Sequence, residues 1–276
     1  MREPAPVSTR PVRPGLVSAK PAICFMAIAS FLLALPLRAA DWPMWRYDAG
    51  RTAASPETLP EDLHLLWVRQ FPPLEPAFWQ VRQERVQFDL GYEPVVMGTT
   101  MFVASSRNDR ITALDTATGA ERWRFYAEGP LRLAPVAWQG KVYCASDDGF
   151  LYCLDATTGN LMWKHRAAPS RRRVMGNGRL ISVWPVRGGP VIAGGKVFFA
   201  AGVWPFEGIF IWALDAESGE PIWVNDRCGS LYIEHPHGAM AFGGPAPQGY
   251  LLVRGAELVA PSSRASGSRK SRPPAM

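Results

Sequence analysis

Metal-binding side chains are concentrated in one stretch of the sequence, residues 226–249. His235 and His237 are separated by a single residue, and Cys228 and Glu234 lie close to them in the chain. Imidazole, thiolate and carboxylate groups are the ligands that zinc and related cations use in proteins. A metal site at the two histidines is one interpretation. An ordered loop whose imidazoles hydrogen-bond to the backbone is the other, and it is the one we favour.

The other polar residues do not form a recognisable catalytic set. Asp147 and Asp148 are adjacent and carry oxygen ligands for a cation, but their surroundings favour a hydrogen-bonded turn. The sequence contains no HExxH, CxxCH or paired CxxC motif, and no Ser-His-Asp set or phosphate-binding glycine loop stands out. We therefore predict no catalytic residue, and the residues themselves assign no cofactor.

The net charge of +6 does not predict nucleic-acid binding, because most of it lies at the two ends of the chain. Residues 1–40 contain five basic residues and one acidic residue, and residues 264–276 contain four basic residues and no acidic one. The middle of the chain is therefore slightly acidic, which is unlike a polyanion-binding surface. Arg171, Arg172 and Arg173 form a local basic run that is typical of a solvated loop.

The first 40 residues are typical of a secretory signal peptide. A basic stretch ends at Lys20, an apolar run extends from 22 to 35, and small residues precede Asp41. The apolar run is shorter than the roughly 20 residues that a membrane-spanning helix needs. We expect cleavage near Ala40 and a periplasmic or secreted protein, with an uncleaved anchor as the alternative.

Three cysteines would remain after cleavage, and export would place them in an oxidising compartment. Cys144 and Cys153 lie on the two arms of one predicted hairpin. The sequence allows either a disulfide between them or two small buried thiols, and we favour the thiols.

A repeated pattern of four residues predicts the fold. Leucine and aspartate are followed after three residues by glycine, and after three more by tryptophan. The three copies are Leu114, Asp115, Gly119 and Trp123; Leu154, Asp155, Gly159 and Trp163; and Leu214, Asp215, Gly219 and Trp223. Each copy follows two short apolar runs separated by glycine, which indicates strands joined by tight turns.

The second copy indicates what one repeat forms. Residues 135–138, 141–145 and 150–154 are predicted strands, and Trp163 ends a fourth. Such a sheet cannot bury both faces alone, so four-stranded repeats of roughly 40 to 50 residues are expected to stack radially into a β-propeller.

Two departures from the repeat are predicted to be functional loops. Residues 164–189 lengthen the connection between the second and third copies, and residues 203–208 replace a tight turn. Loops on a rigid scaffold commonly carry binding residues. The candidate binding-loop residues are Arg171, Arg172, Arg173, Trp184, Trp204 and Glu207.

The segment GFLYCLDATTGNLMW resembles the quinoprotein-type repeat of pyrroloquinoline quinone (PQQ) dehydrogenases and BamB-like propellers. The resemblance covers residues 94–223, and residues 41–59 resemble the lead-in of such exported propellers. It implies that the Asp, Gly and Trp of each motif are structural, with the Trp wedged between blades, so it predicts a fold and no chemistry. PQQ with calcium is left open as a cofactor, although the adjacent cysteine pair of some of these dehydrogenases is absent.

Together these features predict an all-β, incomplete propeller of about three and a half four-stranded antiparallel blades. Its parts are a signal peptide at residues 1–40, a lead-in with a closing strand around Trp67 at 41–91, the repeats at 92–264, and a disordered tail at 265–276. Residues 250–264 align with 92–107 and so begin a fourth blade. The missing blades are expected in a longer protein or a separate chain, and a short propeller, open or self-associated, is the alternative.

Two classes of function fit this sequence. The first is an exported, non-enzymatic scaffold that binds a protein, glycan or small ligand, and no nucleic acid, through loops on one face. The second is the N-terminal half of a PQQ-dependent alcohol or sugar dehydrogenase. We favour the first, because strong structural repeats occur beside no recognisable catalytic set.

Overall fold

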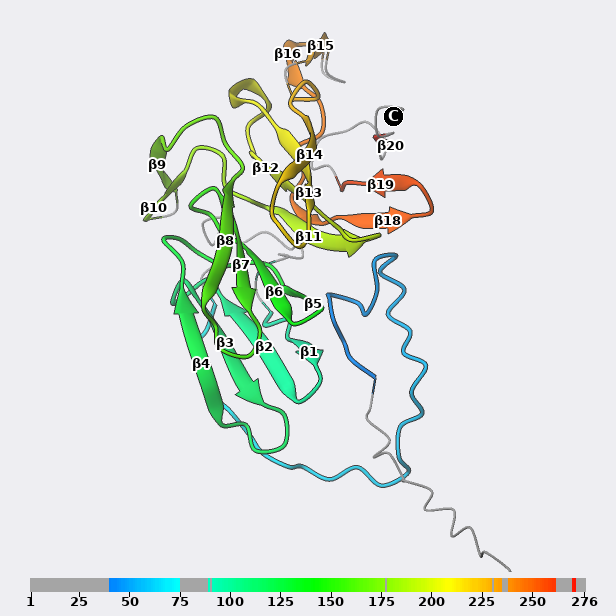
Figure 1. Cartoon of the computed structure of the whole chain (residues 1–276). Coiled ribbons are helices and arrows are strands. Elements are labelled where there is room, and N and C mark those ends of the chain that lie inside the picture. Colours follow the sequence, from blue (N-terminus) through cyan, green and yellow to red (C-terminus); the bar gives the residue numbers. More distant parts are fainter. Residues whose placement is uncertain are drawn as a thin grey trace, which may run out of the picture. The chain divides into compact units, whose positions relative to one another are not determined.

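The computed structural model describes residues 40–74, 89, 91–176, 178–229, 231–234, 238–261 and 270–271. Regular structure in these residues consists of strands and one short 3-10 helix, η1 (Pro205–Glu207) (Figure 1). The predicted signal peptide lies outside the described residues. No helix in the described part of the chain is long and apolar enough to span a membrane.

The three sequence repeats form three sheets, and in each of them the four strands of the repeat are antiparallel and in chain order; the third sheet has a fifth strand from outside the repeat. The first sheet is β1 (Val95–Met97), β2 (Thr100–Ser105), β3 (Arg110–Asp115) and β4 (Glu121–Tyr126). The second is β5 (Val136–Trp138), β6 (Lys141–Ala145), β7 (Phe150–Asp155) and β8 (Leu161–Arg166). The third is β11 (Gly188–Ala193), β12 (Lys196–Ala201), β13 (Phe210–Asp215) and β14 (Pro221–Asn225). The prediction of four-stranded propeller blades is confirmed.

A fourth sheet follows, with three strands in the described residues: β18 (Leu252–Arg254), β19 (Glu257–Val259) and β20 (Lys270–Ser271). The short strand β17 (Gly249–Tyr250) precedes it and pairs in parallel with β11. The fourth blade therefore begins where the sequence predicts. A tail without strands is expected from 265 onward, yet Lys270 and Ser271 pair with β19.

The turn of each repeat is built by its aspartate. Asp155 Oδ1 accepts hydrogen bonds from the backbone N–H groups of Thr157 and Thr158 at 3.0 and 2.7 Å, and from the Thr158 hydroxyl at 2.8 Å. Asp115 and Asp215 accept the equivalent bonds in their own turns. These bonds hold the pKa of Asp155 below its usual value. The aspartates are therefore turn residues, as the resemblance implies.

The glycine of each turn receives a tryptophan from the preceding blade. Gly159 has a φ of +74°, and a Cβ atom placed on it would lie 2.6 Å from the Trp123 ring. The Trp123 indole N–H donates to the Ala156 carbonyl at 3.0 Å, and Trp163 makes the same contacts with the third sheet. Trp67 makes them with Gly119 of the first sheet. Trp123 and Trp163 thus each join two neighbouring blades, and Trp67 joins the lead-in to the first blade.

Two apolar clusters lie on opposite faces of the second sheet. Phe102, Ile111 and Leu154 belong to the cluster shared with the first sheet, whereas Leu151 and Phe199 belong to the cluster shared with the third. Successive residues of a strand point to opposite faces, which is why the central sheet is buried on both sides.

The two cysteines of the second sheet follow the same alternation. Cys144 pairs in register with Tyr152, and Cys153 pairs with Tyr143. Cys144 belongs to the cluster shared with the first sheet and Cys153 to the other, so their thiols point away from each other. The prediction of two buried free thiols is confirmed.

The lead-in crosses the inner strands of the blades. Trp42 exchanges two backbone hydrogen bonds with Val96 of β1, at 3.0 and 2.8 Å. The Pro43 carbonyl accepts from Ala137 of β5 at 2.7 Å, and the Ala49 carbonyl accepts from Val253 of β18 at 2.8 Å. Residues 42–49 thus tie the first, second and fourth sheets together.

Three insertions interrupt the regular blades. A hairpin of β9 (Arg173–Gly176) and β10 (Arg179–Ser182) lies in the predicted insertion 164–189, and η1 lies in the predicted departure 203–208. A second hairpin, β15 (Leu231–Glu234) and β16 (Met240–Gly243), lies in residues 226–249, where the sequence predicts only a loop. Figure 1 shows β15–β16 at the top of the view and β9–β10 at the left, beside the upper end of β8.

Candidate functional site

The predicted binding-loop residues come together where the first hairpin meets η1. The Trp184 indole N–H donates to the Glu207 carbonyl at 2.6 Å. The Arg172 guanidinium carbon lies 5.3 Å from the centroid of the Trp184 ring, and the same guanidinium forms an ion pair with the Glu207 carboxylate. Arg172 and Glu207, which are 35 residues apart in the sequence, therefore link the two insertions.

The other predicted loop residues surround this junction. Arg173 forms an ion pair of 2.6 Å with Glu128, which follows the outer strand β4 of the first sheet. Trp204 precedes η1 and is partly exposed, and Arg171 is exposed. The structure thus places Arg172, Trp184 and Glu207 in direct contact and leaves Arg171, Arg173 and Trp204 around them.

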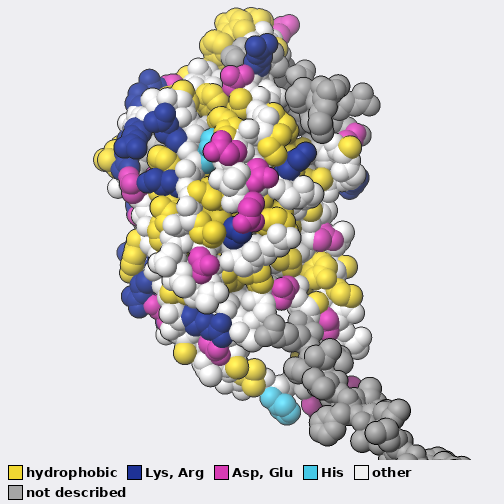
Figure 2. Space-filling view, in the orientation of Figure 1, with side chains coloured by type: hydrophobic (Ala, Val, Ile, Leu, Met, Phe, Trp, Pro, Cys, Tyr) yellow, Lys and Arg dark blue, Asp and Glu magenta, His cyan; other side chains and the backbone are white. Residues whose placement is uncertain are grey.

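Exposed apolar side chains gather on the three insertions. We call them the loop-face patch, and Phe206 of η1, with 61% of its surface exposed, is its most exposed aromatic residue. Its members are Met175, Leu180, Trp204, Phe206, Tyr232, Ile233, Met240 and Phe242. β16 lies against η1, and the Tyr232 and Phe242 rings meet edge to face 5.2 Å apart. Figure 2 shows hydrophobic side chains over β15–β16 and basic side chains over β9–β10.

The predicted metal-binding stretch is only partly described. His235 and His237 lie outside the described residues, whereas Cys228 is described and partly buried. Among the residues that are described, no group of three or more His, Cys, Asp or Glu side chains is close enough to hold a metal ion.

A buried ionic network, which the sequence does not indicate, surrounds the turn between β6 and β7. Asp147 accepts two hydrogen bonds from Arg187, both at 3.0 Å, and one from Arg132 at 2.6 Å. Arg132 also reaches Asp89 at 3.2 Å, and all four side chains are almost fully buried. Burial alone would raise the pKa of Asp147, but the two guanidinium groups outweigh it and lower the pKa. The Asp147 carboxylate therefore links the second sheet to Arg187, which directly precedes β11 of the third sheet.

Asp148 is buried like Asp147, so the turn that contains these two residues is not exposed to solvent. Its carboxylate accepts from the Tyr152 hydroxyl at 2.6 Å and from the backbone N–H groups of Phe150 and Glu128 at 2.9 and 3.1 Å. Burial raises the pKa of Asp148. The interpretation of Asp147 and Asp148 as turn residues holds, but both acids are committed to internal bonds.

A second polar cluster joins the lead-in to the fourth blade. The buried Arg51 guanidinium donates to the carbonyls of Leu251, Trp45 and Pro190 at 2.9, 2.9 and 2.8 Å. Burial lowers the pKa of Arg51 to about 10, a value at which it is still charged at neutral pH. One side chain therefore satisfies carbonyl groups in the lead-in, the third sheet and the start of the fourth.

Glu93 and Tyr250 complete this cluster. The Ala134 N–H donates to the Tyr250 hydroxyl oxygen at 2.7 Å, and that hydroxyl donates to the Glu93 carboxylate. Burial raises the pKa of Glu93 to about 7, against the opposing effects of a hydrogen bond from Trp45 and the charge of Arg51. Glu93 therefore changes protonation near neutral pH.

Two grooves lie between blades in the described structure. The first, of about 430 Å³, is bounded by β8 of the second blade and by Phe210, Trp212 and Val224 of the third. His165 contributes its imidazole, whose buried Nε2 atom has no hydrogen-bond partner in the described residues. Burial lowers the pKa of His165, so the ring is neutral at neutral pH.

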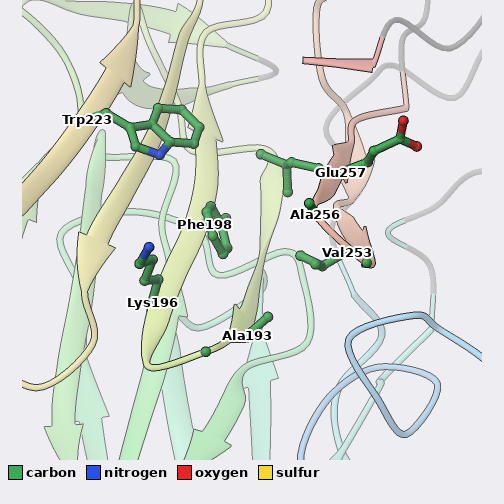
Figure 3. Close-up of a pocket in the computed structure, with 10 residues that line it drawn as sticks. Ala193, Lys196, Phe198, Trp223, Val253, Ala256 and Glu257 are labelled. Atoms are coloured by element: carbon green, nitrogen blue, oxygen red, sulfur yellow. The ribbon is translucent and has the colours of Figure 1, made fainter. Parts of the chain in front are cut away.

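The second groove, of about 300 Å³, separates the third blade from the fourth sheet. Figure 3 shows Trp223 and Phe198 on one side and Val253 and Ala256 on the other. Trp67, Trp123 and Trp163 each fill the equivalent place by donating to a carbonyl of the next blade. Trp223 makes no such hydrogen bond within the described residues. In their own sheets Trp123, Trp163 and Trp223 occupy equivalent, partly buried positions, opposite Ala113, Cys153 and Ala213.

Part of this chain is similar in sequence to known proteins. Residues 67–183 match the sequence profile of the family described as outer membrane protein assembly factor BamB. An alcohol dehydrogenase (quinone), dehydrogenase subunit, of Gluconobacter oxydans (strain 621H) is 33% identical over 142 residues, which cover 47% of this chain and 18% of that relative. The repeats are of the quinoprotein type.

A solved structure shows the same fold. The crystal structure of quinohemoprotein alcohol dehydrogenase from Comamonas testosteroni superposes with a TM-score of 0.56 at 23% identity, over 80% of this chain and 35% of that one. A tetrathionate hydrolase of Acidithiobacillus ferrooxidans is 37% identical over 70 residues, which cover 25% of this chain and 11% of that relative. The chain therefore spans a minor part of each of these relatives, and proteins with differently named activities share its repeats.

The quinoprotein repeat raises the question of a quinone and calcium site. Calcium needs six to eight oxygen ligands, several of them from free carboxylates. Asp147 and Asp148 are the only adjacent buried acids among the described residues, and both are saturated by Arg132, Arg187 and Tyr152. Asp147 and Asp148 are therefore not arranged to hold such a cation.

Proposed function

We propose that this chain is an exported, non-enzymatic propeller scaffold that binds a protein partner through the loop-face patch. The observation that carries the proposal is the joining of three insertions into one surface that exposes aromatic and methionine side chains beside arginines. Aromatic residues, Met and Arg are the side chains that protein interfaces favour over the rest of the surface. Isolated exposed apolar residues need no explanation, but a contiguous group of them marks a contact surface.

The rigidity of the junction supports the same proposal. Arg172, Trp184 and Glu207 hold η1 against the first hairpin, so Phe206 is presented from a fixed base. A surface that is already ordered loses less conformational entropy when it binds. The sequence-based expectation of cleavage near Ala40 would place this surface in the periplasm or outside the cell.

Site-specific photo-crosslinking tests the proposal. A photoreactive phenylalanine analogue at Phe206 is expected to form a discrete adduct in intact cells, and the same analogue at Ile222 of β14 is the matched control, because Ile222 is 45% exposed and lies outside the patch. The captured protein, once purified, should bind the wild-type chain and lose most of that affinity to Phe206→Ser. Equal labelling at both positions, or binding that Phe206→Ser leaves unchanged, would count against a protein-binding patch.

Part of a quinone-dependent alcohol dehydrogenase is the second candidate function, and similarity to the Gluconobacter oxydans subunit supports it. Dye-linked oxidation of ethanol after incubation with PQQ and calcium would favour this candidate. Quenching of tryptophan fluorescence by PQQ in the presence of calcium gives a reading that does not depend on turnover.

A further inference from the structure

A lysine covers two aromatic rings at the junction between the first and second blades. The Lys164 ammonium nitrogen lies 5.0 Å from the centroid of the Phe150 ring and 5.8 Å from that of Tyr152. A Glu128 carboxylate oxygen lies 3.9 Å from the same nitrogen. The ammonium group is attracted by the negative faces of the rings and by the carboxylate. Both aromatic side chains are almost fully buried at this junction.

The next junction, between the second and third blades, has equivalent rings without the lysine. Trp212 has in β13 the place of Tyr152 in β7, and its partner on the neighbouring strand is Val224, whereas the partner of Tyr152 is Lys164. Phe210 begins β13 as its counterpart begins β7. Trp212 and Phe210 are only partly buried, and both line the groove of about 430 Å³. Valine in place of lysine thus leaves two aromatic rings accessible to a ligand.

The two rings are held in place by contacts with neighbouring residues. The Trp212 indole N–H donates to the Ala167 carbonyl at 2.9 Å, and the His165 imidazole meets the Trp212 ring edge to face, with centroids 4.6 Å apart. The Phe210 ring meets the Trp184 ring edge to face, with centroids 6.5 Å apart. A groove whose rings are already fixed loses little conformational entropy when a ligand enters.

The charges around the groove favour a positively charged ligand. Asp226 lines the groove, and its ion pair with Arg227 is long, at 4.0 Å. Arg166, next to His165 in β8, also lines it. Burial lowers the pKa of His165, and the charge of Glu220, which raises this pKa, opposes the charge of Arg166, which lowers it. Glu220 therefore offsets Arg166, the imidazole is neutral, and the Asp226 carboxylate decides the sign of charge that the groove favours.

We propose that this groove binds a quaternary ammonium ion, whose cationic head takes the place that the Lys164 ammonium has at the preceding junction. Phe210 and Trp212 supply the aromatic faces, and Asp226 supplies the opposite charge. Aromatic faces, and tryptophan above all, attract such cations. A quaternary nitrogen has no N–H group, so the apolar walls need supply no hydrogen-bond acceptor. The volume of the groove lies within the range of about 300–1,000 Å³ that is typical of small-ligand sites.

Binding of choline to the full chain tests this proposal, and 3,3-dimethylbutan-1-ol, a neutral molecule of the same shape, is the ligand control. Both molecules carry equivalent methyl groups that give a single sharp proton NMR signal, and this signal broadens when the molecule binds. Choline is expected to bind at least about tenfold more tightly than the alcohol, because only the cation is attracted by the ring faces.

Three substitutions assign the binding to the groove. Val224→Lys restores the lysine of the preceding junction and is expected to weaken choline binding at least about tenfold, because its own ammonium group then covers the rings. Ile222→Lys is the matched control, since it adds the same charge to the same strand outside the groove, and it should leave the affinity unchanged. Asp226→Asn should weaken choline binding about two- to fivefold and leave binding of the alcohol unchanged.

The circular dichroism and melting temperature of each variant should match those of the wild type, so that a change in affinity is not a loss of fold. Equal affinities for choline and the alcohol, a folded wild type that binds no choline, or a Val224→Lys protein that binds it normally would overturn the proposal. The same loss in Ile222→Lys as in Val224→Lys would also contradict it. No member of the loop-face patch lines this groove, so these results leave the proposed partner binding unaffected.

Discussion

The indole of Trp45 stacks on the phenol ring of Tyr250, with ring centroids 4.1 Å apart and an angle of 13° between the planes. The two residues are far apart in the sequence, and the Arg51 guanidinium carbon lies 5.9 Å from the first ring and 5.5 Å from the second. Offset stacking of this kind stabilises a contact by roughly 0.5–1.5 kcal/mol beyond the buried area. The lead-in is therefore fixed to the segment between the third and fourth sheets.

Replacement of Arg51 by alanine tests this attachment. Three carbonyl groups lose a charged donor, and a buried carbonyl without a partner is costly, so Arg51→Ala is expected to lower the free energy of unfolding by about 3 kcal/mol. Hydrogen exchange should accelerate most in β18 and β19. Arg254→Ala is the control, because that arginine is exposed, and it should change neither measurement.

Glu93 makes the same junction sensitive to pH. Its pKa in the folded protein is about 7, above the ordinary value of 4.5, so the folded state binds more protons than the unfolded state between these values. Stability should therefore fall as the pH rises from about 4.5 to 7. In urea unfolding, Glu93→Gln should reduce this slope. Relative to the wild type, the variant should gain more stability at pH 8 than at pH 4. If the variant keeps the same slope, the pH dependence of stability comes from another titrating group.

The repeat could be predicted from the sequence because its signals are local. Asp155 and Gly159 act within one turn, and Trp163 follows at a fixed spacing, so the same residues recur wherever the turn does. Strands 141–145 and 150–154 alternate visibly between two buried faces. Local hydrogen bonds and positive-φ glycines leave a pattern that can be read without any tertiary structure.

The two polar clusters could not be predicted, because their members come from distant segments. Arg51 meets Pro190 and Leu251 only after the blades have stacked, and Arg187 meets Asp147 across two sheets. No spacing rule links such residues. The hairpin β15–β16 could not be predicted for another reason. Its two strands are four residues each, and His235 and His237, which separate them in the sequence, are typical of a loop or a metal site.

Removal of the Asp147 charge tests the buried ionic network. Asp147→Asn removes the carboxylate charge that two buried guanidinium groups share and leaves Asp89 as the printed acidic partner of Arg132, which is expected to cost roughly 3–5 kcal/mol of stability. The pKa of Asp147 is lowered in the folded state, so its contribution is present above the ordinary value of 3.8 and is lost as the pH falls below it. The difference in the free energy of unfolding between the wild type and Asp147→Asn should therefore decrease at acid pH.

Asp226→Asn provides the control for this experiment. Asp226 has more than half of its side-chain surface exposed, and its ion pair with Arg227 is long, at 4.0 Å. An exposed pair of this kind contributes little, so the free energy of unfolding should change by less than about 0.5 kcal/mol. Equal effects of the two substitutions would show that burial of the Asp147 charge is not what stabilises the junction between sheets.

The last prediction separates the wedge contact from the conformation of the glycine that receives it. Gly159 and Gly140 both have a φ of +74°, but a Cβ atom on Gly159 would meet the Trp123 ring at 2.6 Å, whereas one on Gly140 would have no neighbour within 4 Å. Gly140→Ala should cost only the backbone strain, roughly 1–2 kcal/mol. Gly159→Ala should cost roughly 1–3 kcal/mol more, because the indole must move out of its place between blades. Chemical unfolding of the two variants gives the difference directly. Because the strain is matched, equal losses would mean that the tryptophan can shift without cost, and the wedge would then have no part in holding neighbouring blades together.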